Sequence, residues 1–261
     1  MNIGIIGAGN MGGAIARGIA AGSLIPTDKI AVSSTNQDGE LDTLKADCPL
    51  INTSTDNALA AKADLIIIAV KPWILDKVLT QITPMIDFSR QAIISIVAGA
   101  TLEHIAAFAP KDVKPTIFRL IPNIAITVHQ SMTFISPLNA SDDQLKTVCN
   151  LFSELGKVMV VEERLMAAGT ALASCGIAYV MRYVRAASEG GVELGFRADQ
   201  AKDVMLQTLI GAVKMLEATG NNPEVDIDKV TTPGGLTIKG LNTMERFGFT
   251  TAVIEGLKAS L

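Results

Sequence analysis

The first 161 residues alternate between short apolar, β-branched runs and longer segments with helical periodicity. The run Leu65–Val70 is apolar throughout, which is typical of a parallel strand buried on both faces. This alternation predicts strand–helix–strand units and therefore a parallel sheet. We expect strands over residues 2–6, 29–33, 64–70, 91–97 and 116–120, with weaker ones near 132–135 and 157–161.

The pattern changes after Glu162 to long helical periodicity, with one break at Thr231–Gly235. The chain is therefore predicted to be an α/β protein, with a Rossmann-type parallel sheet over residues 1–161 and an all-helical domain over 162–261. The uncharged stretch Leu165–Met181 contains Gly, Ser and Thr and barely reaches bilayer length. We expect a buried helix here, with neighbours on every side and some of them from a second subunit.

The segment Gly7–Gly12 has the form G-x-G-x-x-G, follows the first predicted strand and opens an Ala-rich helix over 11–21. In dinucleotide-binding folds the first Gly permits a tight turn, the second lets the backbone approach the pyrophosphate, and the third lets helix and strand pack closely. The helix N-terminus then faces the phosphates. A tight turn without a ligand is the alternative. The predicted cofactor contacts in this segment are Gly7, Gly9, Asn10 and Met11.

The second predicted strand ends in Ser33–Asn36, where NAD enzymes carry an Asp or Glu that binds the ribose hydroxyls. Hydroxyl and amide groups can donate to a 2′-phosphate, and no carboxylate is expected in this turn. NADP(H) is therefore the predicted cofactor and NAD(H) the alternative, although no Arg lies here and ordinary loop chemistry would also use these residues. Further cofactor contacts are predicted at the ends of strands, namely Ser33, Ser34, Asn36, Val70, Lys71, Pro72, Ala98 and Gly99.

The charge, the cysteines and the N-terminal segment of the chain bear on its partners and on its location in the cell. A net charge of -4 without a basic cluster argues against nucleic acid or an anionic membrane as a partner. Cys48, Cys149 and Cys175 are odd in number and widely spaced, which fits neither a disulfide framework nor a metal site. No basic region precedes the first apolar run, so it is predicted to be a strand and not an export signal. A reducing, cytoplasmic location is expected.

Taken together, these motifs resemble those of the pyrroline-5-carboxylate reductase family over nearly the whole chain. The family's G-x-G-x-M is present as Gly7–Met11, its V-K-P as Val70–Pro72 and its P-N as Pro122–Asn123. The most specific piece, V-x-S-P-G-G-x-T-I, is present as Val230–Ile238.

One segment departs from the family pattern. The family's T-A-L-S-G-S-G-P-A-Y corresponds to Thr170–Tyr179, where Ile177 replaces the Pro, and Met166 stands where an Asp is expected. Loss of a kink-forming Pro and of a carboxylate bears on the dimer interface, the pocket wall and the substrate range. We interpret the change as drift within the family.

The resemblance implies reduction of pyrroline-5-carboxylate to proline by hydride transfer from NADPH, the final step of proline biosynthesis. It also implies a homodimer or a larger assembly of dimers, with each active site between one subunit's cofactor domain and its partner's helical domain, so that a monomer is inactive. Thr237 matches the family position whose hydroxyl binds the ring nitrogen or polarises the imine, and is the predicted catalytic residue. The predicted contacts to this small cyclic imino acid are Asn123, Thr231, Thr232, Pro233, Gly234, Gly235 and Thr237.

The chemistry requires few side chains, since a cyclic iminium is already electrophilic and positioning with protonation suffices. The turn Pro233–Gly235 precedes a helix that is predicted to run to about Phe247, and the start of that helix is a ready site for the substrate carboxylate. Thr231 and Thr232 have an alternative interpretation as helix N-caps, and Asn123 as a turn residue. His104 and His129 are expected to be surface or packing residues, and Cys175 a small buried one.

Two other functions are open. A β-hydroxyacid dehydrogenase would carry a catalytic Lys on the first long helix of the second domain, but no Lys lies between Lys157 and Lys202, and that helix has Arg182 and Arg185. A non-catalytic NADP-binding regulatory protein would explain the altered residues 173–177. The intact Pro233–Gly235 turn and Thr237 argue against it.

Overall fold

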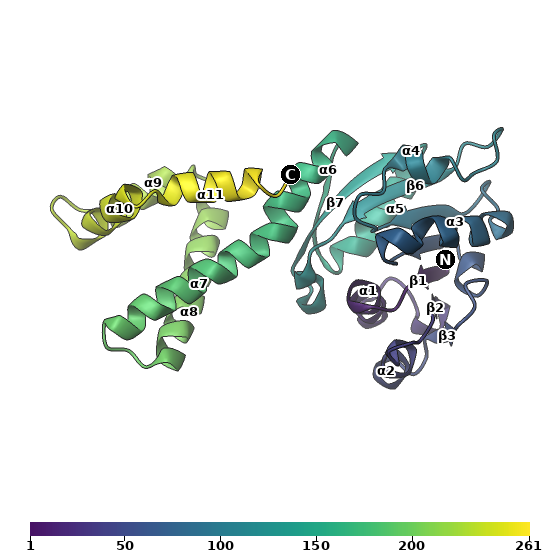
Figure 1. The fold of residues 1–261 in the computed structure, drawn as a ribbon, viewed down its shortest axis with the longest axis horizontal. Coiled ribbons are helices and arrows are strands. Elements are labelled where there is room, and N and C mark those ends of the chain that lie inside the picture. Colours follow the sequence, from purple (N-terminus) through teal and green to yellow (C-terminus); the bar gives the residue numbers. More distant parts are fainter. The chain divides into compact units, whose positions relative to one another are not determined.

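The computed structural model describes residues 1–261, which divide into two compact units, Met1–Ser174 and Cys175–Leu261. The first unit contains the whole sheet, and the second is all-helical (Figure 1). The predicted fold class is confirmed.

Eight strands form one sheet in the order β3-β2-β1-β4-β5-β6-β7-β8. Neighbouring strands are parallel except β6 and β7, which are antiparallel. The strand order reverses between β1 and β4, and this is where open α/β sheets bind ligands at the carboxyl ends of their strands. The strands are β1 (Ile3–Ile6), β2 (Ile30–Ser33), β3 (Asn52–Ser54), β4 (Leu65–Ile68), β5 (Ala92–Ser95), β6 (Thr116–Ile121), β7 (Ser131–Leu138) and β8 (Gly156–Val160).

Each strand expected from the sequence is present, and one further strand was not expected. That strand, β3, pairs with β2 at the edge of the sheet and consists of Asn-Thr-Ser. It has no apolar run because its side chains are exposed or only partly buried, so the hydrophobic pattern carried no signal for it.

Helices cover both faces of the sheet. One core layer joins α1, α2 and α5 to the sheet through Ile15, Leu44 and Leu151, and the other joins α3 and α4 through Leu79 and Ile105. Each such buried side chain contributes about 1.5–3 kcal/mol. The helices of this unit are α1 (Asn10–Ala21), α2 (Glu40–Asp47), α3 (Leu75–Ile82), α4 (Leu102–Ala106), α5 (Asp142–Ser153) and α6 (Met166–Gly169).

The structural division lies later than the predicted boundary at Val161. Residues after β8 still pack on the sheet, since Met166 is fully buried and a Cβ at Gly169 would lie 2.8 Å from the Phe134 ring on β7. The first compact unit therefore extends to Ser174. A functional boundary at Val161 stays a prediction.

The second unit is built around the helices α7 and α8. A Cβ at Gly191 on α7 would lie 2.9 Å from the Cβ of Ala201 on α8, so the two helices pack closely. The rings of Tyr183 on α7 and Phe249 on α11 meet edge to face at 6.4 Å. The helices are α7 (Gly176–Glu193), α8 (Ala198–Thr219), α9 (Pro223–Val230), α10 (Leu236–Arg246) and α11 (Phe249–Lys258).

Within the single chain the helix expected over 165–181 is only partly buried, with Met166, Gly169 and Ala171 buried, and the neighbours expected from a second subunit stay a prediction. Helix α7 has no buried residue, because its neighbours within the chain cover only part of its surface. The helical stretch Glu163–Glu193 is long and apolar enough to cross a membrane by length and composition, and only 17% of its apolar window is buried. Length and composition alone are weak evidence for a membrane span.

Candidate active site

The glycine loop between β1 and α1 has the geometry of a dinucleotide cradle. Gly7 has a φ of +103°, which a residue with a side chain rarely adopts. A Cβ at Gly12 would lie 1.9 Å from the carbonyl oxygen of Gly7, so helix and loop approach too closely for any side chain. A Cβ at Gly9 would meet nothing within 4 Å, so the space in front of Gly9 is open. These are the three roles that glycines play around a pyrophosphate.

The start of α1 is equally suited to an anion. The helix has Gly9 as its N-cap, with no side-chain cap and no acidic residue in its first turn. Its first N–H groups therefore have no partner within the helix, and the helix dipole is not neutralised. The loop and this helix start fit a dinucleotide pyrophosphate, which Gly7, Gly9, Asn10 and Met11 would contact.

Strands β2 and β4 bring the other predicted cofactor residues beside the loop. The Gly7 N–H donates to the Ser33 carbonyl at 2.7 Å, and the Ala69 N–H donates to the Ile6 carbonyl at 2.8 Å. A Cβ at Gly7 would lie 3.2 Å from the Val70 side chain. The carboxyl ends of β1, β2 and β4 thus lie together around the glycine loop.

Two exposed segments extend this edge of the sheet. Lys71 is exposed and precedes the short 3-10 helix Pro72–Ile74, in which the proline is the first residue, as its fixed φ favours. Ala98 and Gly99 follow β5, which lies next to β4, and Gly99 has a φ of +79° with open space at its Cβ position. Both segments lie where a ligand would reach them, and their contact with cofactor stays a prediction.

The turn after β2 differs from the sequence-based expectation in one respect. Ser33 is fully buried and its hydroxyl donates to Asn57 at 2.8 Å, so of the three predicted cofactor residues in this turn only Ser34 and Asn36 have side chains outside the core. The Ser34 hydroxyl donates to the Glu40 carboxylate at 2.5 Å. The expectation that no carboxylate lies in this turn is therefore wrong. Glu40 lies six residues beyond Ser34, and the chain folds back between them.

Asn123 is almost fully buried, and its side chain already has partners. Its amide donates to the Ala173 carbonyl at 3.3 Å, and its Oδ1 accepts from the Ala125 N–H at 3.1 Å. It is the N-cap of the 3-10 helix Ile124–Val128, which agrees with the alternative interpretation as a turn residue.

The altered family segment contains a π-helix, Thr170–Cys175, directly before α7. Such wider turns are frequent at functional sites. The helix therefore departs from α geometry here although Ile177 replaces the family's proline. Met166 is fully buried, and a thioether at this position avoids the cost of burying a carboxylate.

The turn before α10 supplies a second anion-binding helix start, within the helical unit. Gly234 has a φ of +71°, and Gly235 is the N-cap of α10 with no side-chain cap and no acidic residue in the first turn. The Gly235 N–H donates to the Thr232 carbonyl at 2.9 Å. Thr237 is exposed in the first turn of α10. The interpretation of Thr231 and Thr232 as N-caps is wrong, since Gly235 is the N-cap of α10 without a side-chain cap, and the Thr231 hydroxyl donates back to the Asp228 carbonyl at 3.2 Å.

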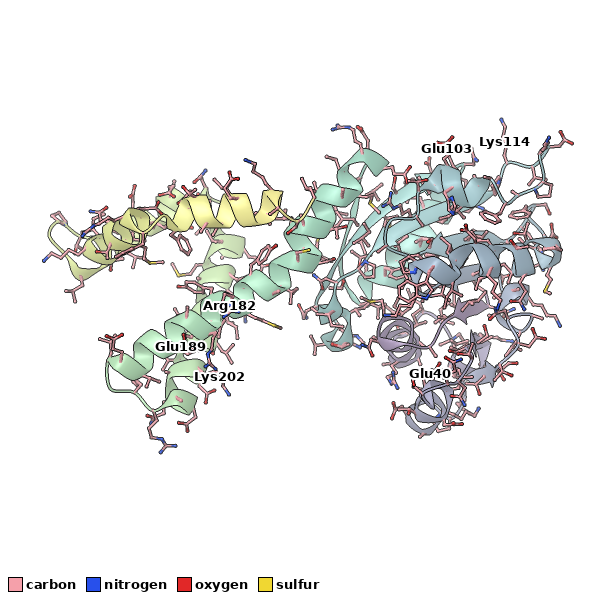
Figure 2. All side chains as sticks on the ribbon, in the orientation of Figure 1. Glu40, Glu103, Lys114, Arg182, Glu189 and Lys202 are labelled. Atoms are coloured by element: carbon pink, nitrogen blue, oxygen red, sulfur yellow. The ribbon has the colours of Figure 1, made fainter.

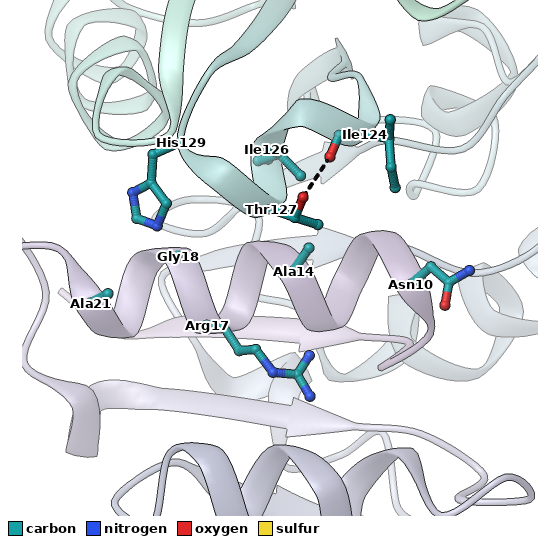
Figure 3. Close-up of a pocket in the computed structure, with 9 residues that line it drawn as sticks. All are labelled: Asn10, Ala14, Arg17, Gly18, Ala21, Ile124, Ile126, Thr127 and His129. Carbon is teal, nitrogen blue, oxygen red and sulfur yellow. Dashed lines mark hydrogen bonds between the residues drawn. The ribbon is translucent and has the colours of Figure 1, made fainter. Parts of the chain in front are cut away.

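A cavity of about 400 Å³ lies between α1 and the 3-10 helix Ile124–Val128 (Figure 3). Asn10 lines one end and His129 contributes from the other element. Asn10 is the one predicted site residue that lines it.

The two histidines have structural partners. The His104 ring lies 2.7 Å from an Asp76 carboxylate oxygen, with both side chains half-exposed, and the His129 ring lies 3.1 Å from the Glu154 carbonyl. Cys175 is partly buried. These contacts agree with the expected surface and packing roles.

Comparison with known proteins finds relatives that match over the whole chain. The family model of pyrroline-5-carboxylate reductase dimerisation matches residues 163–261, and that of NADP oxidoreductase, coenzyme F420-dependent, matches residues 2–99. The pyrroline-5-carboxylate reductase of Synechocystis is 34% identical over 262 residues, which cover 100% of this chain and 96% of that protein.

Two further matches agree. Pyrroline-5-carboxylate reductase 1 of Dictyostelium discoideum is 37% identical over 270 residues, which cover 99% of this chain, and the chain spans about half (48%) of that relative's length. The crystal structure of Plasmodium falciparum pyrroline carboxylate reductase with NADP bound superposes with a TM-score of 0.87 at 26% identity, covering 100% of this chain and 95% of that one.

The sheet, the glycine loop and the helical second unit thus define an NADP-dependent oxidoreductase of the Rossmann type. The chain belongs to the pyrroline-5-carboxylate reductase family. The predicted family and enzyme class are confirmed, and the model matched by residues 2–99 agrees with NADP(H) as cofactor.

Proposed function

We propose that the chain reduces pyrroline-5-carboxylate to proline, the final step of proline biosynthesis, with NADPH as the reductant. The observation that carries the proposal is the start of α10, where the uncapped Pro233–Gly235 turn and the exposed Thr237 hydroxyl lie within one helical turn. A small anionic imine needs a site for its carboxylate and a group at its ring nitrogen. This segment offers both.

The residues have separate tasks in this proposal. The backbone N–H groups at the start of α10 bind the substrate carboxylate, as helix N-termini bind anions. Thr237 donates a hydrogen bond at the imine nitrogen or polarises it, and Thr231 and Thr232 border the same turn. The glycine loop holds the cofactor pyrophosphate, and the bound cofactor supplies the hydride.

The assay that tests this function follows NADPH oxidation with pyrroline-5-carboxylate and identifies proline as the product. Absence of turnover in a chain that binds NADPH would contradict it. Oxidation of β-hydroxy acids would instead support the dehydrogenase alternative, although α7 has Arg182 and Arg185 and no Lys.

We also propose a homodimer, or an assembly of dimers, working in the cytoplasm, and that only the assembled form is active. The helical unit matches a dimerisation model. Helices α7 and α8 expose many large apolar side chains, and an exposed apolar patch is typical of an interaction surface. The exposed residues include Tyr179, Val180, Met181, Val192, Val204, Ile210, Val213 and Met215.

Dilution with parallel sizing tests this link, and activity is expected to fall as the dimer dissociates. Met181→Asp places a charge on α7 and is expected to yield an inactive monomer. Leu50→Asp is the matched control, since Leu50 is exposed to a similar degree in the first unit. Full activity in a verified monomer would contradict the proposal.

A further inference from the structure

Glu40 is held at the end of β2 by a local reversal of the chain. Asn36 and Gly39 both have a positive φ, +56° and +69°, and helix α2 begins with Glu40 directly after them. The Glu40 carboxylate accepts from the Ser34 hydroxyl at 2.5 Å and from the Asp38 N–H at 3.0 Å. Figure 2 labels Glu40 on helix α2.

In dinucleotide-binding folds of this type, the adenosine ribose would lie at this position, at the end of the second strand. Ser34 follows β2 directly, and the preceding Ser33 carbonyl accepts from the Gly7 N–H of the glycine loop. In NAD enzymes of this fold an acidic residue at the end of β2 binds the ribose 2′-hydroxyl. Glu40 brings a carboxylate to that place from a later point in the sequence.

The carboxylate is charged and has no basic partner. The hydrogen bond from Ser34 is the main cause that holds the pKa of Glu40 below its ordinary value, so the group is ionised at neutral pH. Its hydrogen-bond donors are a hydroxyl and a backbone N–H, neither of them positive. The nearby Asn36 amide is likewise engaged, donating to Asp42 at 3.0 Å. The Ser34 hydroxyl and the Asn36 amide, two of the donors expected to bind a 2′-phosphate, thus both donate to carboxylates.

We propose that Glu40 is a specificity-determining residue of the cofactor site, which opposes the 2′-phosphate of NADPH and accepts a hydrogen bond from the 2′-hydroxyl of NADH. The inference rests on the dinucleotide site of the proposed function. A phosphate monoester carries a charge of about -1.5 to -2 at pH 7, so its approach to Glu40 is repulsive. The consequence is a chain that uses both dinucleotides, with NADPH bound less tightly than the fold alone would allow.

Direct binding of NADPH, NADH and 2′,5′-ADP, measured by calorimetry without substrate, tests the role of Glu40. The series Glu40→Gln and Glu40→Lys removes and then reverses the charge. We expect Glu40→Gln to tighten NADPH and 2′,5′-ADP by about tenfold and Glu40→Lys by more, and both variants to bind NADH less tightly than the wild type. The gain should shrink at high salt, as screening requires.

Asp38→Asn is the matched control, because it removes a charge from the same turn without removing the Glu40 carboxylate. It is expected to leave the ratio of the two dissociation constants within about twofold. An unchanged ratio in both Glu40 variants, with both dinucleotides bound, would overturn the role of Glu40 and leave the proposed reaction standing. Binding of neither dinucleotide by the wild-type chain would overturn both. Circular dichroism of each variant verifies its fold.

Discussion

The guanidinium of Arg119 on β6 donates to the carboxylate of Glu163 across 2.9 Å, and the Arg119 side chain is only 12% exposed. The same carboxylate oxygen accepts from the Leu102 N–H at 2.7 Å, so Glu163 links β6 to the start of α4. Glu163 is also the first residue matched by the dimerisation model. The ion pair therefore anchors the segment that leaves the sheet.

Glu163→Ala is expected to lower the free energy of unfolding by about 2 kcal/mol, because it leaves a largely buried guanidinium without its anion. Urea unfolding measures the loss. Glu162→Ala is the control, since Glu162 pairs with Arg164 at the surface with both side chains about 70% exposed, and a change of no more than about 0.5 kcal/mol is expected. Equal losses in the two variants would show that Glu163 has no special role.

Gly9→Ala is expected to fold normally but to weaken NADPH binding by at least about tenfold. The added methyl meets no protein atom within 4 Å and fills the space where the pyrophosphate would approach. Thermal unfolding and calorimetric titration measure the two effects separately. In Gly12→Ala the methyl meets the Gly7 carbonyl, so that variant should lose stability as well as binding. Normal NADPH affinity in Gly9→Ala would place the cofactor elsewhere.

Thr237→Ala is expected to lower kcat by about a hundredfold while NADPH affinity is kept, because the hydroxyl acts only at the imine. Thr243→Ala removes a hydroxyl further along α10, where it donates to the Lys239 carbonyl, and should leave turnover nearly unchanged. Steady-state kinetics with cofactor titration separates the two variants. Unchanged turnover in Thr237→Ala would remove this residue from the mechanism.

Asp226 makes the stability of the helical unit depend on pH. Its carboxylate is buried and accepts from Lys229, Thr219 and Asn221. The Lys229 hydrogen bond is the main cause that lowers its pKa. A carboxyl whose pKa is lower in the folded state stabilises the fold above its unfolded pKa of about 3.9, and this contribution is lost as pH falls through the folded value.

Asp226→Asn is accordingly expected to lower Tm at pH 7, and the difference from wild type should shrink as the pH falls from about 4 to 2. Thermal scans across this range measure it. Asp228→Asn, at an exposed position two residues on, should change Tm little at any pH. A Tm difference independent of pH would assign the effect to packing and not to charge.

Much of the fold could be predicted because it depends on local patterns. The apolar run Leu65–Val70 by itself indicates a strand buried on both faces, and the structure has it between two parallel neighbours, β1 and β5. The glycine loop is equally local, since the strand, turn and helix that it joins are contiguous. The edge strand Asn52–Ser54 has no apolar run in the sequence. It is a strand because its backbone pairs with β2, and its side chains are not buried in the core.

The site could be predicted only where its residues are contiguous. The Pro233–Gly235 turn with Thr237 is readable as a motif, and the structure shows the helix start it implies. The hydrogen bond between Ser34 and Glu40 could not be predicted from the sequence. It depends on the chain reversing direction between the two residues, which the positive φ of Asn36 and Gly39 allows.

By itself the sequence determined the parallel sheet, the glycine loop and the helical second unit, because hydrophobic period and glycine placement act over a few residues. Only the tertiary structure decided that Glu163 meets Arg119, that Asn123 caps a 3-10 helix and engages Ala173, and that a carboxylate lies at the end of β2. Such contacts join residues through the folding of the backbone, and no local pattern of polar and apolar positions records them.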